Sequence, residues 1–309
     1  MSSADTSQEV HFELYRYTPS VPAAAVFVAV FIALSVWHGV LLLRHRTLFF
    51  IPFLIGLLLE AAGYAARIFS HYDTLALGPY IVQTMLILVA PPLFAASIYM
   101  TLGRLIVNLG AEKASIIRVK YITKIFVVGD VVSFLLQCGG GGYMAAGSLS
   151  AMETGEQIVI AGLAVQLAFF GFFIVASAIF HYRVRANANK NTLYSPAPLS
   201  TDSSARVSGS WEGMLWCLYG ACMLIFIRSV FRVIEFVQGN DGYIMRREWL
   251  LYVFDAVLMA AQAILLVLVY PGRVVAGAPR AGDVALGSRA DSAEAMVPVS
   301  LGGRKSELC

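Results

Sequence analysis

Charged residues are scarce in this sequence of 309 residues. Asp, Glu, Lys and Arg together make up 13% of the chain, whereas about 25% is usual for a soluble domain. Hydrophobic residues make up 59%, and the mean hydropathy is +0.74. A single soluble core stops growing at about 250–300 residues, so it cannot absorb this much apolar surface. The composition therefore disfavours a soluble enzyme or a disordered scaffold and predicts that most of the chain lies in lipid.

Histidine, cysteine and lysine are missing from the positions that several membrane-protein classes need. The chain has five histidines, and only His38 lies in an apolar stretch, so the ligand cluster of a seven-span metal hydrolase is absent. Residues 249–270 contain no lysine that could carry retinal, and no Walker motif is present to bind ATP. Four cysteines do not form a disulfide framework. We therefore expect no metal, no cofactor and no enzymatic activity, and the net charge of +3 gives no reason to expect nucleic-acid binding.

What the sequence does contain is seven apolar stretches of about 20 residues, the length needed to cross a bilayer as a helix. Backbone groups in lipid must be hydrogen-bonded internally, so these stretches are predicted to be helices. The predicted fold is all-α, a polytopic membrane protein built as a seven-transmembrane-helix bundle. The spans are expected at about 21–43, 48–69, 79–103, 121–143, 157–180, 214–238 and 249–270.

Basic residues predict the orientation of the bundle. The side that holds the 1–2, 3–4 and 5–6 loops and the C-terminus carries sixteen Lys and Arg, whereas the opposite side carries three. By the positive-inside rule, the N-terminus is outside and the C-terminus is cytoplasmic. We expect an extracellular segment over 1–20, a membrane domain over 21–272 and a disordered cytoplasmic tail over 273–309. The 5–6 loop, about 182–213, and the tail are candidate binding sites for cytoplasmic regulators.

Seven charged residues lie inside the predicted spans, where a charge costs about 2.5–3.5 kcal/mol on insertion scales. Residues three or four apart share a helix face, so each charge groups with polar neighbours that should point into the bundle. The spacing predicts a polar chamber that opens towards the outer leaflet and is lined by spans two, four, six and seven. Its candidate substrate-binding residues are Glu60, Tyr64, Arg67, Asp130, Gln137, Arg228, Arg232, Glu235, Tyr252 and Asp255.

An alternative interpretation of these charges is that they form salt bridges that only pack the helices. Two further features have similar alternatives. Pro91 and Pro92 remove two backbone donors from span three and should break or bend it, either at a substrate site or as a static kink. The run of four glycines that contains Gly140 and Gly141 permits close helix approach, local unwinding or a flexible exit loop. We treat Pro91, Pro92, Gly140 and Gly141 as candidate gating positions.

The order of these motifs resembles the fungal RTA-like proteins, also called lipid-translocating exporters. The resemblance covers about residues 25–272. One departure is Tyr270, where His is expected in many relatives. The motifs that carry the resemblance are Glu60-x-x-Gly63-Tyr64-x-x-Arg67, Ala90-Pro91-Pro92-Leu93, Asp130-x-x-Ser133 with Gln137, Gly162-Leu163 with Gln166, and Arg228-x-x-Phe231-Arg232-x-x-Glu235 followed by Glu248, Tyr252 and Asp255.

The resemblance implies a fungal seven-span protein in the plasma membrane, with an endomembrane as the alternative location. Members are linked to resistance to toxic amphiphiles, to release of sphingoid long-chain bases and to phospholipid asymmetry. The first hypothesis is therefore a translocator or exporter of lipids or sterol-like amphiphiles that binds the polar head in the charged chamber. The alternatives are a seven-span lipid sensor that signals to the cytoplasm and a transporter related to porphyrin or haem handling.

Overall fold

The computed structural model describes residues 20–72, 77–115, 117–144, 148–190, 211–239, 242–243 and 247–272. These residues form helices and no β-strand. The expected N-terminal segment, most of the 5–6 loop and the C-terminal tail lie outside the described residues. The helices are α1 (Val21–His45), η1 (Leu48–Phe50), α2 (Ile51–Tyr72), α3 (Leu77–Asn108), η2 (Glu112–Ala114), α4 (Val119–Met144), α5 (Leu149–Lys190), α6 (Trp211–Gln238), α7 (Glu248–Leu251), η3 (Tyr252–Val257) and α8 (Leu258–Leu268).

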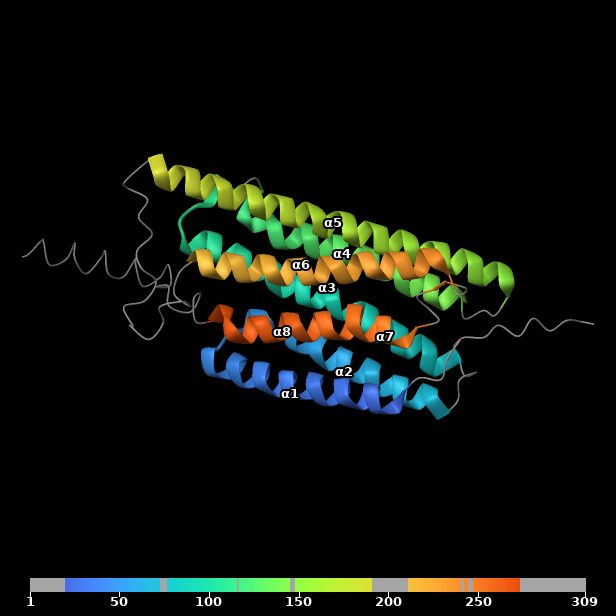
Figure 1. Ribbon diagram of the computed structural model, residues 1–309. Coiled ribbons are helices and arrows are strands. Elements are labelled where there is room, and N and C mark those ends of the chain that lie inside the picture. The colour runs from blue at the N-terminus through green and yellow to red at the C-terminus, as the bar shows by residue number, and fades with distance from the viewer. Residues whose placement is uncertain are drawn as a thin grey trace, which may run out of the picture. The chain divides into compact units, whose positions relative to one another are not determined.

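The described residues form seven helices long and apolar enough to cross a membrane, which confirms the predicted seven spans. The long helices run side by side in Figure 1, and α7, η3 and α8 follow one another in line as the last span. Span five is longer than predicted, because its apolar segment covers Ser150–Ala186 within a helix of 42 residues. The orientation of the bundle in the membrane stays a prediction.

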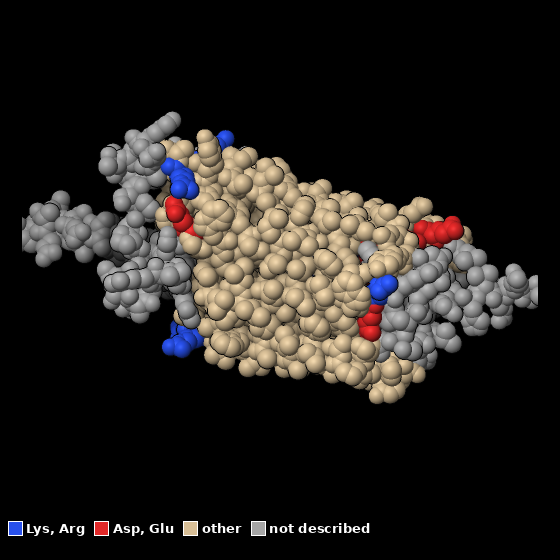
Figure 2. Space-filling view, in the orientation of Figure 1, with Lys and Arg blue, Asp and Glu red and all other residues tan. Residues whose placement is uncertain are grey.

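On the side of the bundle that Figure 2 shows, the charged side chains lie at the two ends and the surface between them is formed by uncharged residues. Large apolar side chains are exposed along the helices; for example, Leu43 of α1 is 76% exposed and Trp37 is 59% exposed. Water would penalise such a surface, whereas lipid does not. An apolar outer surface of this kind is suited to contact with lipid.

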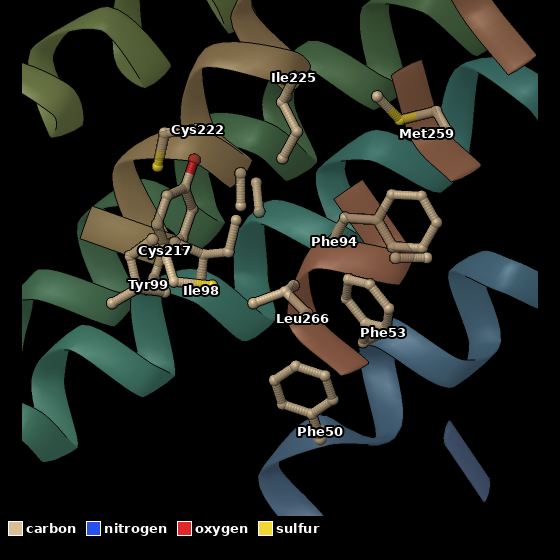
Figure 3. Packing of buried hydrophobic residues seen from close by; sticks show 14 of the residues in the cluster. Phe50, Phe53, Phe94, Ile98, Tyr99, Cys217, Cys222, Ile225, Met259 and Leu266 are labelled. Carbon is tan, nitrogen blue, oxygen red and sulfur yellow. The ribbon is translucent and has the colours of Figure 1, made fainter. Parts of the chain in front are cut away.

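Aromatic residues fill the interior between α2, α3, α6 and α8 (Figure 3). The rings of Phe53 and Phe94 lie 4.6 Å apart between centroids, and Tyr99 lies 4.4 Å from Phe173. Cys217 and Cys222 are buried, free thiols in this core. They pack as small hydrophobic residues.

Glycines bring two pairs of helices into close approach. A Cβ on Gly63 of α2 would lie 2.6 Å from Ile87 Cγ1 of α3, and a Cβ on Gly140 of α4 would lie 2.6 Å from the Gly155 carbonyl oxygen of α5. Residues 139–142 are helical throughout, so the interpretations of local unwinding and of an exit loop were wrong. The glycine run lets the helices pack closely, and a gating role for Gly140 and Gly141 stays a prediction.

Candidate functional site

The ion network is a set of buried charged side chains from α2, α6 and the last span. Ion pairs of 2.5–3.0 Å join three arginines to three carboxylates in two neighbouring groups, Arg67 with Glu248 and the other four residues centred on Asp255. Five of its six members are buried, and the sixth, Glu248, has a side chain that is 19% exposed. The inward direction predicted for these charges is therefore confirmed. The members are Arg67, Arg228, Arg232, Glu235, Glu248 and Asp255.

Asp255 is the centre of the ion network. Its Oδ1 lies 2.5 Å from Arg228 Nε, and its Oδ2 accepts a hydrogen bond of 2.7 Å from Arg232 Nη2. Oδ2 also accepts from the Tyr64 hydroxyl at 3.1 Å. Arg232 also donates through Nη1 to Glu235 Oε2 at 2.9 Å. One fully buried carboxylate thus joins α2 and α6 to the last span.

The backbone that carries Asp255 is a π-helical turn, Tyr252–Val257, between α7 and α8. Single π-helical turns are rare inside α-helices and are frequent at functional sites. The wider turn inserts a residue and changes which face of the helix points into the bundle. Sequence spacing had treated the last span as a regular helix and did not predict this turn.

Pro91 of α3 is linked to the ion network through a carbonyl oxygen, and the predicted break of span three at the two prolines was wrong. The helix runs from Leu77 to Asn108 without a break, although Pro91 has no N–H to donate to the carbonyl of Ile87, four residues earlier. Arg228 Nη2 donates to that Ile87 oxygen at 2.7 Å. The buried arginine therefore supplies the hydrogen bond that the proline removes, and it links α3 to Asp255.

Glu248 lies at the end of the ion network that is next to the start of α1. Its Oε1 accepts a hydrogen bond of 3.0 Å from Arg67 Nη2 and one of 2.8 Å from the backbone N–H of Ser20. The Tyr252 hydroxyl also donates to this oxygen at 3.3 Å and accepts from Arg67 Nε at 3.2 Å. These contacts tie α1 and α2 to the first turns of the last span.

Glu60 is different from the other carboxylates. It is fully buried on α2, and within the described part of the chain neither of its oxygens has a hydrogen-bond donor. It nevertheless lies close enough to Asp255, Arg228 and Arg232 to interact with them electrostatically. The glycines at 56 and 63 bring this face of α2 against α3. Glu60 is therefore a buried carboxyl group, without a hydrogen-bond donor among the described residues, beside a network of paired charges.

Four aromatic rings from α1, α2 and the last span lie over the ion network. Phe27 stacks on Tyr252 at 5.3 Å and Phe31 stacks on Tyr64 at 5.8 Å, with interplanar angles of 6° in both pairs. Tyr64 and Tyr252 lie 6.0 Å apart. Aromatic faces attract cations, so these rings give the site an apolar wall that is compatible with a cationic group.

Asp130 and Gln137, both predicted to line the same chamber, interact elsewhere. Asp130 of α4 is buried beside Tyr99 of α3. Gln137 Nε2 donates to Gln166 Oε1 of α5 at 2.9 Å and to Ser133 Oγ at 3.1 Å. The structure thus brings spans two, six and seven together around Asp255, and α1 and α3 also contact this site. The polar contacts of Asp130 and Gln137 on α4 are instead with α3 and α5.

Sequence reasoning did not assign a site role to Glu248, Phe27, Phe31 or the Ile87 carbonyl. A signal for Glu248 was present, because it lies four residues before Tyr252 and seven before Asp255, on the same face of a helix. The carbonyl could have been found by counting back four residues from Pro91. The two phenylalanines lie in a charge-free span and carry no such signal.

A seven-helix bundle with an apolar outer surface and a buried ion network is a multi-pass integral membrane protein. The profile of the family described as "RTA1 like protein" matches residues 53–278. The chain belongs to this family, which confirms the resemblance drawn from its motifs.

Three relatives from Saccharomyces cerevisiae indicate the range of the family. The chain is 37% identical to "Protein RTA1" over 286 residues, covering 84% of this chain and 85% of that protein. It is 37% identical to "Protoporphyrin uptake protein 1" over 295 residues, covering 84% and 91%. It is 27% identical to "Sphingoid long-chain base transporter RSB1" over 256 residues, covering 76% and 67%. No solved structure matches the chain.

Proposed function

We propose that this protein is a membrane transporter that moves amphiphilic small molecules across the bilayer and binds their polar heads at the ion network. The observation that carries the proposal is Glu60, a buried carboxyl group beside paired charges and without a hydrogen-bond donor among the described residues. A buried carboxylate requires a counter-charge, because transfer of an unpaired ion from water is very unfavourable. An ammonium head supplies that charge.

A sphingoid long-chain base has this chemistry, with an ammonium group on a long apolar tail. Its head would lie between Glu60 and the rings of Tyr64 and Tyr252, and its tail would stay in the surrounding lipid. The name of one relative, a sphingoid long-chain base transporter, supports this substrate class. We place the protein in the plasma membrane, oriented with its N-terminus outside. We assign no catalytic step to it.

Porphyrins are the second candidate substrate, because the chain is 37% identical to a relative named for protoporphyrin uptake. Protoporphyrin carries two carboxylates, which would bind to arginines. In this structure each arginine of the ion network already contacts a carboxylate of the chain. A porphyrin would have to replace one of those contacts, whereas an ammonium head would use a carboxyl group that is not paired.

The test is flux in liposomes that contain the purified full-length chain. Labelled long-chain base, labelled phospholipid and protoporphyrin are compared in vesicles with wild type, with Glu60→Gln, and without protein. We expect base flux above the protein-free rate for wild type and a loss of most of that excess for Glu60→Gln. The exposed Glu153 of α5 provides the matched control, since Glu153→Gln makes the same chemical change away from the network.

The possible outcomes separate the hypotheses. Porphyrin flux without base flux would favour the second substrate. Saturable binding of the base without any flux would overturn the proposal of a transporter and would favour a lipid sensor. Flux from Glu60→Gln equal to that of wild type would remove Glu60 from the site.

A further inference from the structure

The charges around Asp255 do not balance. Three guanidinium groups, of Arg67, Arg228 and Arg232, can be paired one to one with Glu248, Asp255 and Glu235. Glu60 is a fourth carboxyl group, and the described residues supply no fourth cation in contact with it. If every group is ionised, these seven described side chains together carry one excess negative charge, and Asp255 and Glu60 are both fully buried.

The surroundings of Glu60 oppose that charge. The titratable and charged groups that act on it are Asp255 of η3, Arg228 and Arg232 of α6, and Tyr64 of its own helix. The two arginines already bind Asp255, and Arg232 also binds Glu235, so two carboxylates offset their two positive charges. The faces of α1 and α3 that pack around this turn present Phe31 and Ile87, which do not titrate.

We infer that Glu60 holds a proton in the resting protein and exchanges it for the cationic head of the transported molecule. The inference rests on the proposed function and adds its coupling ion. One proton leaves the carboxyl group for water as one ammonium group arrives, so the ion network, Glu60 and the bound head together are neutral before and after the exchange. Transport of the cation is thereby coupled to movement of a proton in the opposite direction.

This coupling gives the transporter a source of work. The sequence contains no Walker motif, so a gradient must drive any uphill movement. A proton gradient across the membrane would drive the exchange, and cations would move outward when protons move inward.

The test counts protons released on binding. The full-length chain in lipid nanodiscs is titrated calorimetrically with an N-trimethylated sphingoid base, whose permanent charge releases no proton itself. The titration is repeated in buffers of different ionisation enthalpy, and the slope of the heat against that enthalpy gives the number of protons. We expect one proton per bound base for wild type and for Glu153→Gln, and none for Glu60→Gln.

The pH dependence of binding is a second readout. Release of one proton predicts that affinity rises about tenfold per pH unit while Glu60 is protonated in the free protein. Affinity of Glu60→Gln should not change with pH. Glu60→Asp keeps a titratable carboxyl group and should keep proton release with weaker binding, which distinguishes proton exchange from a purely structural role.

Results that overturn the inference differ from those that overturn the function. Base flux in liposomes together with zero proton release by wild type would leave a transporter without proton exchange. Proton release that persists in Glu60→Gln would assign the proton to another group. Absence of both binding and flux would instead overturn the proposed function. If Glu60→Gln does not fold, a wild-type slope of zero still overturns the inference, and a Glu60→Asp variant that releases a proton with unchanged affinity would contradict the assignment to Glu60.

Discussion

Between α2, α6 and the last span the buried polar groups are charged, whereas between α4 and α5 they are hydroxyls and amides. In the α4–α5 contact, the Ser133 hydroxyl donates to the Gly162 carbonyl at 2.7 Å and Gln137 bonds to Gln166. Gly140 and Gly155 bring the two backbones together there. Beside the ion network, by contrast, the carboxyl group of Glu60 has no hydrogen-bond donor among the described residues. The comparison indicates that the α4–α5 polar groups hold two helices together, while the ion network also keeps a site for a cation.

The largest effect should follow from removing the centre of the ion network. Asp255→Ala leaves Arg228 and Arg232 without their shared carboxylate, and breaking a buried ion pair by removing one partner costs about 3–5 kcal/mol. Thermal unfolding of the purified chain in detergent measures the loss. Glu235→Gln is the comparison variant and should cost less, because Arg232 keeps its bond to Asp255. Equal losses would show that Asp255 is not the centre.

A smaller effect is expected in the α4–α5 contact when a methyl group is added to Gly140. Its Cβ would lie 2.6 Å from the Gly155 carbonyl oxygen, so the helices must separate slightly. Overpacking of this kind costs about 1–3 kcal/mol. Gly139→Ala makes the same change next to it, where no atom lies within 4 Å of the added group, and should not destabilise the protein. The two variants are compared by their unfolding temperatures, and equal temperatures would contradict the close contact.

The smallest effect is expected for a single neutral hydrogen bond in the α4–α5 contact. Ser133→Ala removes the bond to Gly162 and one acceptor of Gln137, which keeps its bond to Gln166. The expected loss is about 1 kcal/mol. The exposed Ser150→Ala serves as the control in the same unfolding assay. A loss of stability as large as that of Asp255→Ala would mean that neutral and charged buried contacts contribute equally to the free energy of unfolding.

The sequence predicted the seven spans and the inward direction of their charges for a simple physical reason. An apolar length of about 20 residues and a helical spacing of three or four are both local properties. The length of α5 was underestimated at both ends, because the helix runs from Leu149 to Lys190 and so includes polar residues on either side of the predicted span. Helix formation there does not depend on hydropathy, so a hydropathy boundary could not locate its end.

Pairing within the site was harder to predict, because it depends on how helices are rotated against one another. Spacing put Asp130 on an inward face but could not say whether that face meets Asp255 or Tyr99. The π-helical turn at Asp255 also shifts the register of the last span, and no residue type encodes it uniquely. The contacts of Glu248 with Arg67 and Ser20 join segments 181 and 228 residues apart, beyond the reach of local patterns.

The hydrogen bond between Arg228 and the Ile87 carbonyl has an evolutionary consequence. A descendant that replaced Pro91 would regain a backbone donor, which would share that oxygen with Arg228. A descendant that replaced Arg228 first would leave the buried Ile87 carbonyl without that hydrogen-bond donor. The arginine is therefore needed most where the proline is present, and we expect the two residues, 137 positions apart in the chain, to be inherited as a pair.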